Sequence, residues 1–146
     1  MPWPNGRPRS EETRRLQSLH SPRVRPYRWR PSRVRNLTDV EAAWVGAMIE
    51  GEGSIGIGRQ SKGVLVQVCN TELETIATLL RLVGDGVIHM RRPPTDGVHQ
   101  QVWSWHLTGN LPVQGLLPQI VPYLTGKRNR AEQVLGKIAQ AAVVPG

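Results

Sequence analysis

The chain has 146 residues, 38% of them hydrophobic, which allows one compact domain with a lean core. Its formal net charge of +8 and its isoelectric point near 11.0 indicate a polyanionic partner, nucleic acid before an anionic membrane. The single cysteine, Cys69, excludes an internal disulfide framework, and no apolar run reaches the roughly 18 residues of a membrane span, so we expect no membrane partner.

The positive charge is concentrated at the start of the chain. Residues 1–36 hold ten Arg and two Glu and carry the whole excess, while residues 37–146 are neutral. A segment so rich in Arg and Pro cannot bury enough apolar surface to offset its ordering entropy. We therefore predict a flexible basic arm over residues 1–36 and a core domain over residues 37–146. Aromatic side chains interleaved with the arginines would let the arm stack on bases; the alternative is a solvated tail with loose attraction to DNA.

The first elements of the core follow from capping and alternation. Thr38 and Glu41 form a capping box, which predicts a helix over residues 39–51. Alternating apolar and small or polar residues then predict two strands, 54–60 and 64–69, joined by a short turn.

A second helix and a second hairpin follow. Thr71 and Glu74 read as another capping box, and Gly84 is the natural end of the helix that it opens. Two further strands are expected over residues 86–92 and 98–107, with a loop of prolines and glycine between them.

The remaining chain is expected to be helical. An apolar stretch begins at Asn110 and should be broken by Pro118 and Pro122, and a last helix should run from about residue 127 to 142. Helices and hairpins without strand–helix–strand crossovers predict an α+β fold with an antiparallel sheet.

A stripe of small residues marks the first predicted helix. Ala43, Ala47 and Gly51 recur at every fourth position, so two copies of the helix could approach closely. Such pairing would bring two Glu52 carboxylates together, and these would require a hard divalent cation such as Mg²⁺. The alternative, which composition alone favours, is a helix packed on its own sheet, with Glu50 and Glu52 as solvated end charges.

The residues from Val45 to Gly53, Val-Gly-Ala-Met-Ile-Glu-Gly-Glu-Gly, resemble the signature motif of LAGLIDADG homing endonucleases. The strand before Asn70 and the segment from Pro122 to Lys127 are similar to later parts of that family, so the resemblance spans roughly residues 38–140. It is nearest to members with one motif, which act as homodimers. It implies an αββαββα fold with a saddle-shaped four-stranded antiparallel sheet packed on helices.

The resemblance also implies an activity. The protein would be a homing endonuclease that hydrolyses double-stranded DNA at a long pseudo-palindromic site, as a homodimer, with Mg²⁺ or Mn²⁺ and no small-molecule cofactor. Glu52 and the carbonyl of Gly51 would bind metal, Lys127 would offset charge on the phosphate, and Asn70 would hold the water network. Two departures from the family are Glu50, where the motif carries Asp, and Glu74, where some relatives carry a basic residue.

The predicted surfaces follow from the same resemblance. The hairpins would lie in the major groove and contact DNA. The expected DNA-contacting residues are Gln60, Lys62, Gln67, His89, Arg91, Arg92, Gln100, Ser104, His106, Arg128 and Arg130. The expected dimer interface consists of Ala43, Trp44, Ala47, Met48 and Gly51.

Two other functions remain open. The same scaffold could be a catalytically inactive DNA-binding protein or an RNA-splicing maturase. A small basic adaptor that binds RNA or ribosomes through its arm would instead be a monomer. Arg outnumbers Lys by sixteen to three and Phe is absent, which favours a bacterial or phage context and the cytoplasmic nucleoid. An organelle is less expected, because the prolines interrupt any amphipathic targeting helix.

Overall fold

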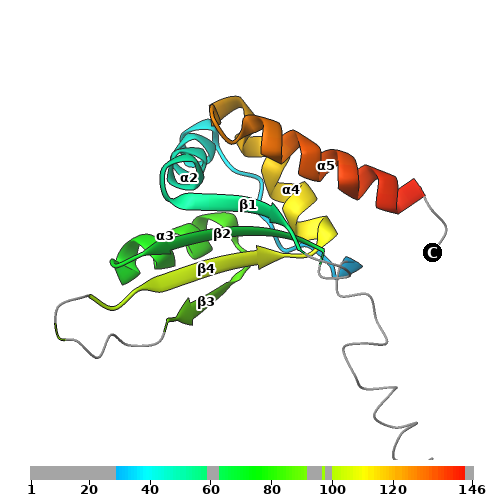
Figure 1. The fold of residues 1–146 in the computed structure, drawn as a ribbon. Helices are drawn as coiled ribbons and strands as arrows, with labels where there is room; N and C mark the ends of the chain where they lie inside the picture. The colour runs from blue at the N-terminus through cyan, green and yellow to red at the C-terminus, as the bar shows by residue number, and fades with distance from the viewer. Residues whose placement is uncertain (1–28, 59–62, 92–96, 98–99, 144–146) are drawn as a thin grey trace, which may run out of the picture.

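The computed structural model describes residues 29–58, 63–91, 97 and 100–143. Its elements occur in the order helix, hairpin, helix, hairpin, helices, which confirms the α+β class (Figure 1). They are α2 (Asp39–Glu52), β1 (Gly53–Ile57), β2 (Val64–Asn70), α3 (Leu73–Val83), β3 (Val87–Met90), β4 (Trp103–Thr108), α4 (Asn110–Ile120), the 3₁₀ turn η3 (Val121–Tyr123) and α5 (Arg128–Val143).

The four strands form one antiparallel sheet in the order β1-β2-β4-β3. Within the described residues, helices α2, α3, α4 and α5 lie on one side of this sheet, and no described helix covers the opposite face (Figure 1). The register places Ile55, Val66 and Leu107 in one row across β1, β2 and β4. These three side chains are buried, so the alternation read from the sequence assigned the core face correctly.

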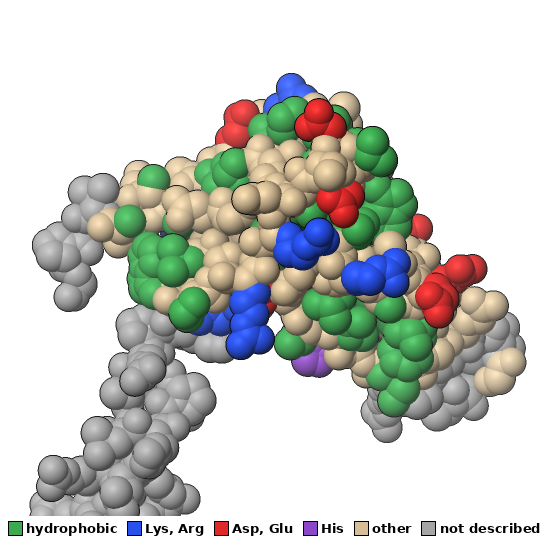
Figure 2. Space-filling model, turned by 180° about the vertical axis from the view of Figure 1, so that it is seen from behind, with side chains coloured by type: hydrophobic (Ala, Val, Ile, Leu, Met, Phe, Trp, Pro, Cys, Tyr) green, Lys and Arg blue, Asp and Glu red, His purple; other side chains and the backbone are tan. Residues whose placement is uncertain are grey.

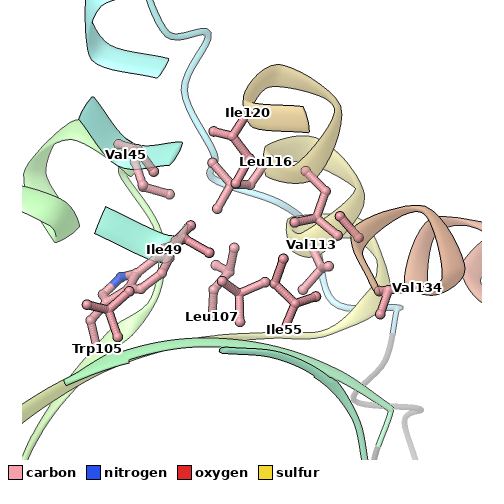
Figure 3. Close-up of a cluster of buried hydrophobic side chains, with 14 of the residues drawn as sticks. Val45, Ile49, Ile55, Trp105, Leu107, Val113, Leu116, Ile120 and Val134 are labelled. Atoms are coloured by element: carbon pink, nitrogen blue, oxygen red, sulfur yellow. The ribbon is translucent and has the colours of Figure 1, made fainter. Parts of the chain in front are cut away.

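The core fills the space between the sheet and the helices (Figure 3). In the close-up, side chains from α2, α4 and α5 meet those of the sheet, and Trp105 lies at the base of α2. The labelled members are Val45, Ile49, Ile55, Trp105, Leu107, Val113, Leu116, Ile120 and Val134. Burial of this apolar surface is what fixes α2 on the sheet.

Helix α2 begins and ends at positions that the sequence specifies. The amide of Glu41 donates to the Thr38 hydroxyl at 3.2 Å, and the amide of Thr38 donates to the Glu41 carboxylate at 2.9 Å, which confirms the capping box. The helix leads directly into β1 at Gly53. A Cβ there would lie 2.8 Å from the Cα of Ile49 and 2.9 Å from the carbonyl oxygen of Gln67, so only glycine fits this junction.

The second predicted capping box is wrong. Helix α3 has Glu72 at its N-cap without a side-chain cap bond. The side chain of Asn70 takes that place, since its Oδ1 accepts from the amide of Glu72 at 2.8 Å. The other end agrees with the prediction: Gly84 has φ +86°, and its amide donates to the carbonyl of Leu80.

Pro118 does not break α4, contrary to expectation. The helix runs through it to Ile120 before the 3₁₀ turn that contains Pro122. Proline removes the hydrogen bond to the carbonyl four residues earlier, that of Gln114. Gln114 and Pro118 both lie on the exposed side of α4, where water can satisfy that carbonyl. Strands β3 and β4 are also shorter than predicted, and α5 begins one residue later.

The described residues begin at residue 29, before the domain boundary predicted at residue 37. We call residues 30–37 the strap, because they run along the folded core. At its start, the Arg30 guanidinium lies 3.1 Å from Asp85, and the amide of Arg33 donates to the same carboxylate at 2.9 Å. Residues 1–28, the rest of the predicted arm, lie outside the described residues.

The second half of the strap joins the helices. The amide of Arg35 donates to the carbonyl of Val83 at 2.8 Å, and the amide of Leu37 donates to the side chain of Gln119 at 2.7 Å. These backbone hydrogen bonds hold the segment against α3 and α4 despite its polar composition. Among the described residues, every helix is too short or too polar to cross a lipid bilayer.

Candidate active site and nucleic-acid interface

Glu52, the expected metal ligand, is the last residue of α2, and its side chain is exposed. Its carboxylate accepts a hydrogen bond from Nδ2 of Asn70 at 2.5 Å. Because Oδ1 of Asn70 is already engaged by the amide of Glu72, both ends of this amide side chain are fixed. The structure thus brings together two of the predicted catalytic residues, with Asn70 orienting the carboxylate of Glu52.

Glu50 has a role that sequence reasoning missed. Its carboxylate accepts from the amides of Thr125, Gly126 and Lys127, at 3.1, 2.6 and 3.2 Å, and from the Thr125 hydroxyl at 3.0 Å. These three amides directly precede α5, and the positive end of a helix dipole attracts an anion. The motif acid therefore fastens α5 to the last turn of α2.

This environment changes the acidity of Glu50. Desolvation by itself would raise the pKa of the carboxyl, but the hydrogen bonds from Thr125, Lys127 and Gly126 outweigh it and hold the pKa below its ordinary value. Glu50 is thus an ionised structural acid at neutral pH, whereas Glu52 in the same turn is free to meet a ligand.

Lys127 lies against the end of α2. Its Nζ donates to the carbonyls of Ile49 and Glu50, at 2.9 and 2.6 Å. An ammonium group has three N–H donors, so one remains for another acceptor. The positive charge also faces the negative end of the α2 dipole, two to three residues from Glu52. This position is compatible with the predicted role beside a phosphate, which stays a prediction.

The oxygen donors at the end of α2 fit a metal ion that takes its remaining ligands from water and substrate. Within the described residues, no group of three or more His, Cys, Asp or Glu side chains could hold a metal ion. Glu52 and the Gly51 carbonyl supply only two oxygens, and Mg²⁺ characteristically takes one or two carboxylates and fills its other positions with water and phosphate oxygens. The donor set therefore suits a hard divalent ion whose remaining positions are filled by water and phosphate oxygens.

One face of α2 is turned away from the core. The stripe of small residues lies on this face, while α2 packs on its own sheet, as the alternative expected, through other residues. Of the five predicted interface residues, Ala47 and Gly51 are exposed, and Ala43, Trp44 and Met48 are partly buried. Trp44 and Met48 also pack against the hydrophobic core. The opposite face is buried through Ala42, Val45, Gly46 and Ile49. Val40, 80% exposed, extends the outward apolar face.

The open face of the sheet carries the predicted base-contacting residues. Gln67 on β2 pairs with His106 on β4, and the rings of His89 and His106 lie 4.8 Å apart. Arg91 is exposed near this pair and donates to Sγ of Cys69 at 3.3 Å. Desolvation, then the charges of His89 and Arg91, lower the pKa of His106, so its ring is neutral at neutral pH.

Ser104 does not fit the predicted contact with DNA. It is only 2% exposed, and its hydroxyl lies 3.1 Å from Nε2 of His106. Its strand neighbours in register, Cys69 and His89, flank it and carry larger side chains. The Ser104 hydroxyl therefore contacts the ring of His106, and Ser104 is too buried to contact DNA itself.

The other predicted DNA contacts are distributed as follows. Gln100, Arg128 and Arg130 are exposed. Gln60, Lys62 and Arg92 lie outside the described residues. Figure 2 shows one face of the protein, on which Lys and Arg side chains lie apart among apolar and acidic ones without forming a single basic patch.

Comparison with solved structures identifies the fold. The homing endonuclease I-CvuI in complex with its target matches with a TM-score of 0.58 and 21% identity, over 72% of this chain and 69% of that chain. The archaeal intron-encoded homing endonuclease I-Vdi141I, complexed with DNA, matches with a TM-score of 0.56 and 12% identity, over 71% of this chain and 70% of that one. Searches of family models and of curated proteins found no match to the sequence.

The chain therefore has the LAGLIDADG homing endonuclease fold, which confirms at the level of structure the resemblance read from its motif.

Proposed function

We propose that the protein is a site-specific endonuclease that hydrolyses double-stranded DNA as a homodimer with Mg²⁺ or Mn²⁺. One observation carries this proposal: the outward small-residue face of α2 ends in the exposed, oriented carboxylate of Glu52. The fold supports it, because the matched homing endonucleases are DNA complexes.

The geometry of α2 supports the proposed homodimer. Ala47 and Gly51 are exposed, and no atom lies within 4 Å of a Cβ built on Gly51. Two copies of this face related by a two-fold axis would let the helix backbones approach closely. Each copy would then bring one Glu52 to the axis, so that the pair serves both DNA strands and the target is pseudo-palindromic.

Four residues at or beside the end of α2 would take part in this mechanism. Glu52 and the Gly51 carbonyl would hold the divalent ion, which, when bound, polarises the scissile phosphate and lowers the pKa of water. Asn70 keeps the carboxylate of Glu52 in one orientation. Lys127 offers its remaining N–H to a phosphate oxygen and offsets charge that develops there. The matched structures of I-CvuI with DNA were obtained in the presence of Ca or Mg, which is consistent with a divalent ion.

The open face of the sheet would meet the major groove. Gln67, His106 and Arg91 offer donors and acceptors of the kinds that read base edges. Arg128 and Arg130 at the start of α5 are suited to phosphates, which position the protein without specifying sequence. The arginines of residues 1–28 would add long-range attraction to DNA. We place this activity in the cytoplasm of a bacterial or phage-infected cell.

The test is cleavage of supercoiled plasmid that carries the native insertion site, with Mg²⁺ as the only divalent ion. The wild type should nick and then linearise the plasmid, and Glu52→Gln should reduce the rate by at least about 100-fold. Glu132→Gln, which removes an acid from the exposed side of α5, is the matched control and should cut normally.

Three results would overturn the proposal or part of it. If Glu52→Gln cleaves at the wild-type rate, Glu52 does not hold the metal. If the wild type binds the site and never nicks it, the protein is an inactive DNA-binding relative. Light scattering that finds only monomers at cleaving concentrations would exclude the homodimer.

A further inference from the structure

A cavity of about 400 Å³ lies between the strap and the end of the sheet. Arg30 and Arg33 line it from the strap, and Val87, His106 and Thr108 line it from β3 and β4, with Asp85 beside them. None of the residues predicted from the family motif, apart from His106, belongs to it. The cavity therefore has a lining of its own, most of which the proposed function has not used.

The charges around the cavity leave a cationic excess. The Asp85 carboxylate, 7% exposed, lies 3.1 Å from the Arg30 guanidinium and accepts from the amides of Arg33 and Gly86 at 2.9 and 2.7 Å. Its hydrogen bonds and the Arg30 charge outweigh desolvation, which alone would raise its pKa, and hold that pKa below the ordinary value. Asp85 and Arg30 thus neutralise each other.

Arg33 is the charge that remains. Its side chain is exposed, and it forms no ion pair with any residue that the structure describes. Within the part of the chain that the structure describes, Arg33 uses only its backbone amide, in the hydrogen bond to Asp85. The guanidinium is free to bind an anion, and its planar donors suit the oxygens of a phosphate.

The cavity adjoins the surface proposed to read DNA. His106 lines the cavity and also stands in one row across the sheet with Ser54, Gln67 and Val87. A duplex that lies along this open face would therefore pass His106, which is also part of the cavity lining.

We propose that this cavity seats a phosphate of the DNA backbone, with Arg33 supplying the cation and the Arg30–Asp85 pair holding the strap in place. The inference rests on the proposed DNA-binding function and extends the expected contact area beyond the two hairpins. In this arrangement, the strap is part of the DNA-binding surface and fixes the register of the protein on the duplex.

The salt dependence of DNA binding tests the inference. Full-length protein is titrated with a linear duplex over a range of salt concentrations, and each phosphate contact contributes about 0.9 to the slope of log K against log salt. We expect Arg33→Gln to lower this slope by about one unit. Arg81→Gln removes the same charge from the exposed surface of α3 and should leave the slope unchanged.

The outcomes separate this inference from the proposed function. Equal slopes for wild type and Arg33→Gln, or equal losses in both variants, would overturn the phosphate seat while leaving cleavage by the wild type intact. A further measurement follows the His106 ring by NMR during titration with inorganic phosphate. If Arg33→Gln abolishes that response but leaves the DNA slope unchanged, the cavity holds a free anion, and the backbone proposal fails.

Discussion

Glu50 and Lys127 form two reciprocal hydrogen bonds, each between the side chain of one residue and the backbone of the other. The carboxylate of Glu50 accepts from the amide of Lys127 at 3.2 Å, while Nζ of Lys127 donates to the carbonyl of Glu50 at 2.6 Å. The end of α2 and the start of α5 thereby form one unit. Glu52 lies two residues beyond this contact, so its position relative to α5 depends on it.

Replacement of Glu50 should change stability in a pH-dependent way. Because the folded-state pKa is lowered, the carboxylate stabilises the fold above the ordinary pKa of 4.5, and this contribution is lost as pH falls through the lowered value. Glu50→Gln should therefore unfold at lower urea concentration than wild type near neutral pH.

As the pH falls through the lowered folded-state pKa of Glu50, the wild-type carboxyl becomes protonated and the difference between the two proteins should shrink. The measurement is urea unfolding from neutral to acidic pH, with Glu132→Gln as the control for loss of a surface charge. A Glu50→Gln deficit that persists unchanged in acid would contradict an ionised role for Glu50.

The glycines of the motif should respond differently to alanine. Gly53→Ala places a Cβ 2.8 Å from Ile49 Cα and 2.9 Å from the Gln67 carbonyl oxygen, so the backbone must shift, at about 1–3 kcal/mol of stability. Gly51→Ala meets no atom within 4 Å in one protomer and should leave monomer stability unchanged or raise it by up to about 1 kcal/mol.

Gly51→Ala should nevertheless weaken the dimer and slow cleavage, since its methyl group would occupy the proposed helix contact. Thermal unfolding and light scattering of the two variants distinguish these effects. A Gly51→Ala protein that dimerises and cuts like wild type would show that the helices do not approach at this residue.

Ala47→Glu should prevent dimerisation without unfolding the protein. Ala47 is exposed, so the substitution should change the monomer's stability by no more than about 0.5 kcal/mol. A two-fold axis would place two new carboxylates near each other, and their repulsion opposes association. Sedimentation should find monomers, and plasmid cleavage should be lost. Ala139→Glu, on the exposed side of α5, is the control and should remain dimeric and active.

Asn70→Ala should lower the cleavage rate more than it lowers DNA affinity. The change frees the Glu52 carboxylate from its Nδ2 partner and leaves the amide of Glu72 without its acceptor. Both groups are exposed and can bind water, so we expect a loss of about 1 kcal/mol in stability. The informative readout is the Mg²⁺ concentration needed for half-maximal nicking, which should rise. An unchanged metal requirement would leave Asn70 with only its structural role at the start of α3.

Local sequence patterns predicted most elements of the fold. The Thr38 capping box, the left-handed Gly84 and the alternation through Val64, Val66 and Val68 each involve neighbours in the chain, so the sequence displays them directly. The outward stripe of α2 was also readable, but whether it faced solvent or sheet was not. Which face is outward depends on the side of the helix from which the larger side chains pack into the core.

Long-range contacts at the site could not be read in the same way. The Glu50 partners lie 75 to 77 positions away, and Arg30 and Asp85 are 55 positions apart. A helix start without an obvious cap at Thr125–Lys127 is the one signal that an acid from elsewhere was needed. For Ser104, alternation predicted the correct face of the strand. It could not show that larger neighbouring side chains bury this small one.

The strap limits how far the protein can be shortened. A version that begins at residue 37, as composition alone suggests, would remove Arg30 and leave Asp85 as a buried carboxylate without its cation. Such a fragment would be expected to aggregate for reasons unrelated to DNA. A truncation or fusion that starts at residue 29 would retain the ion pair, so the contribution of the preceding arginines can be measured on a protein that still folds.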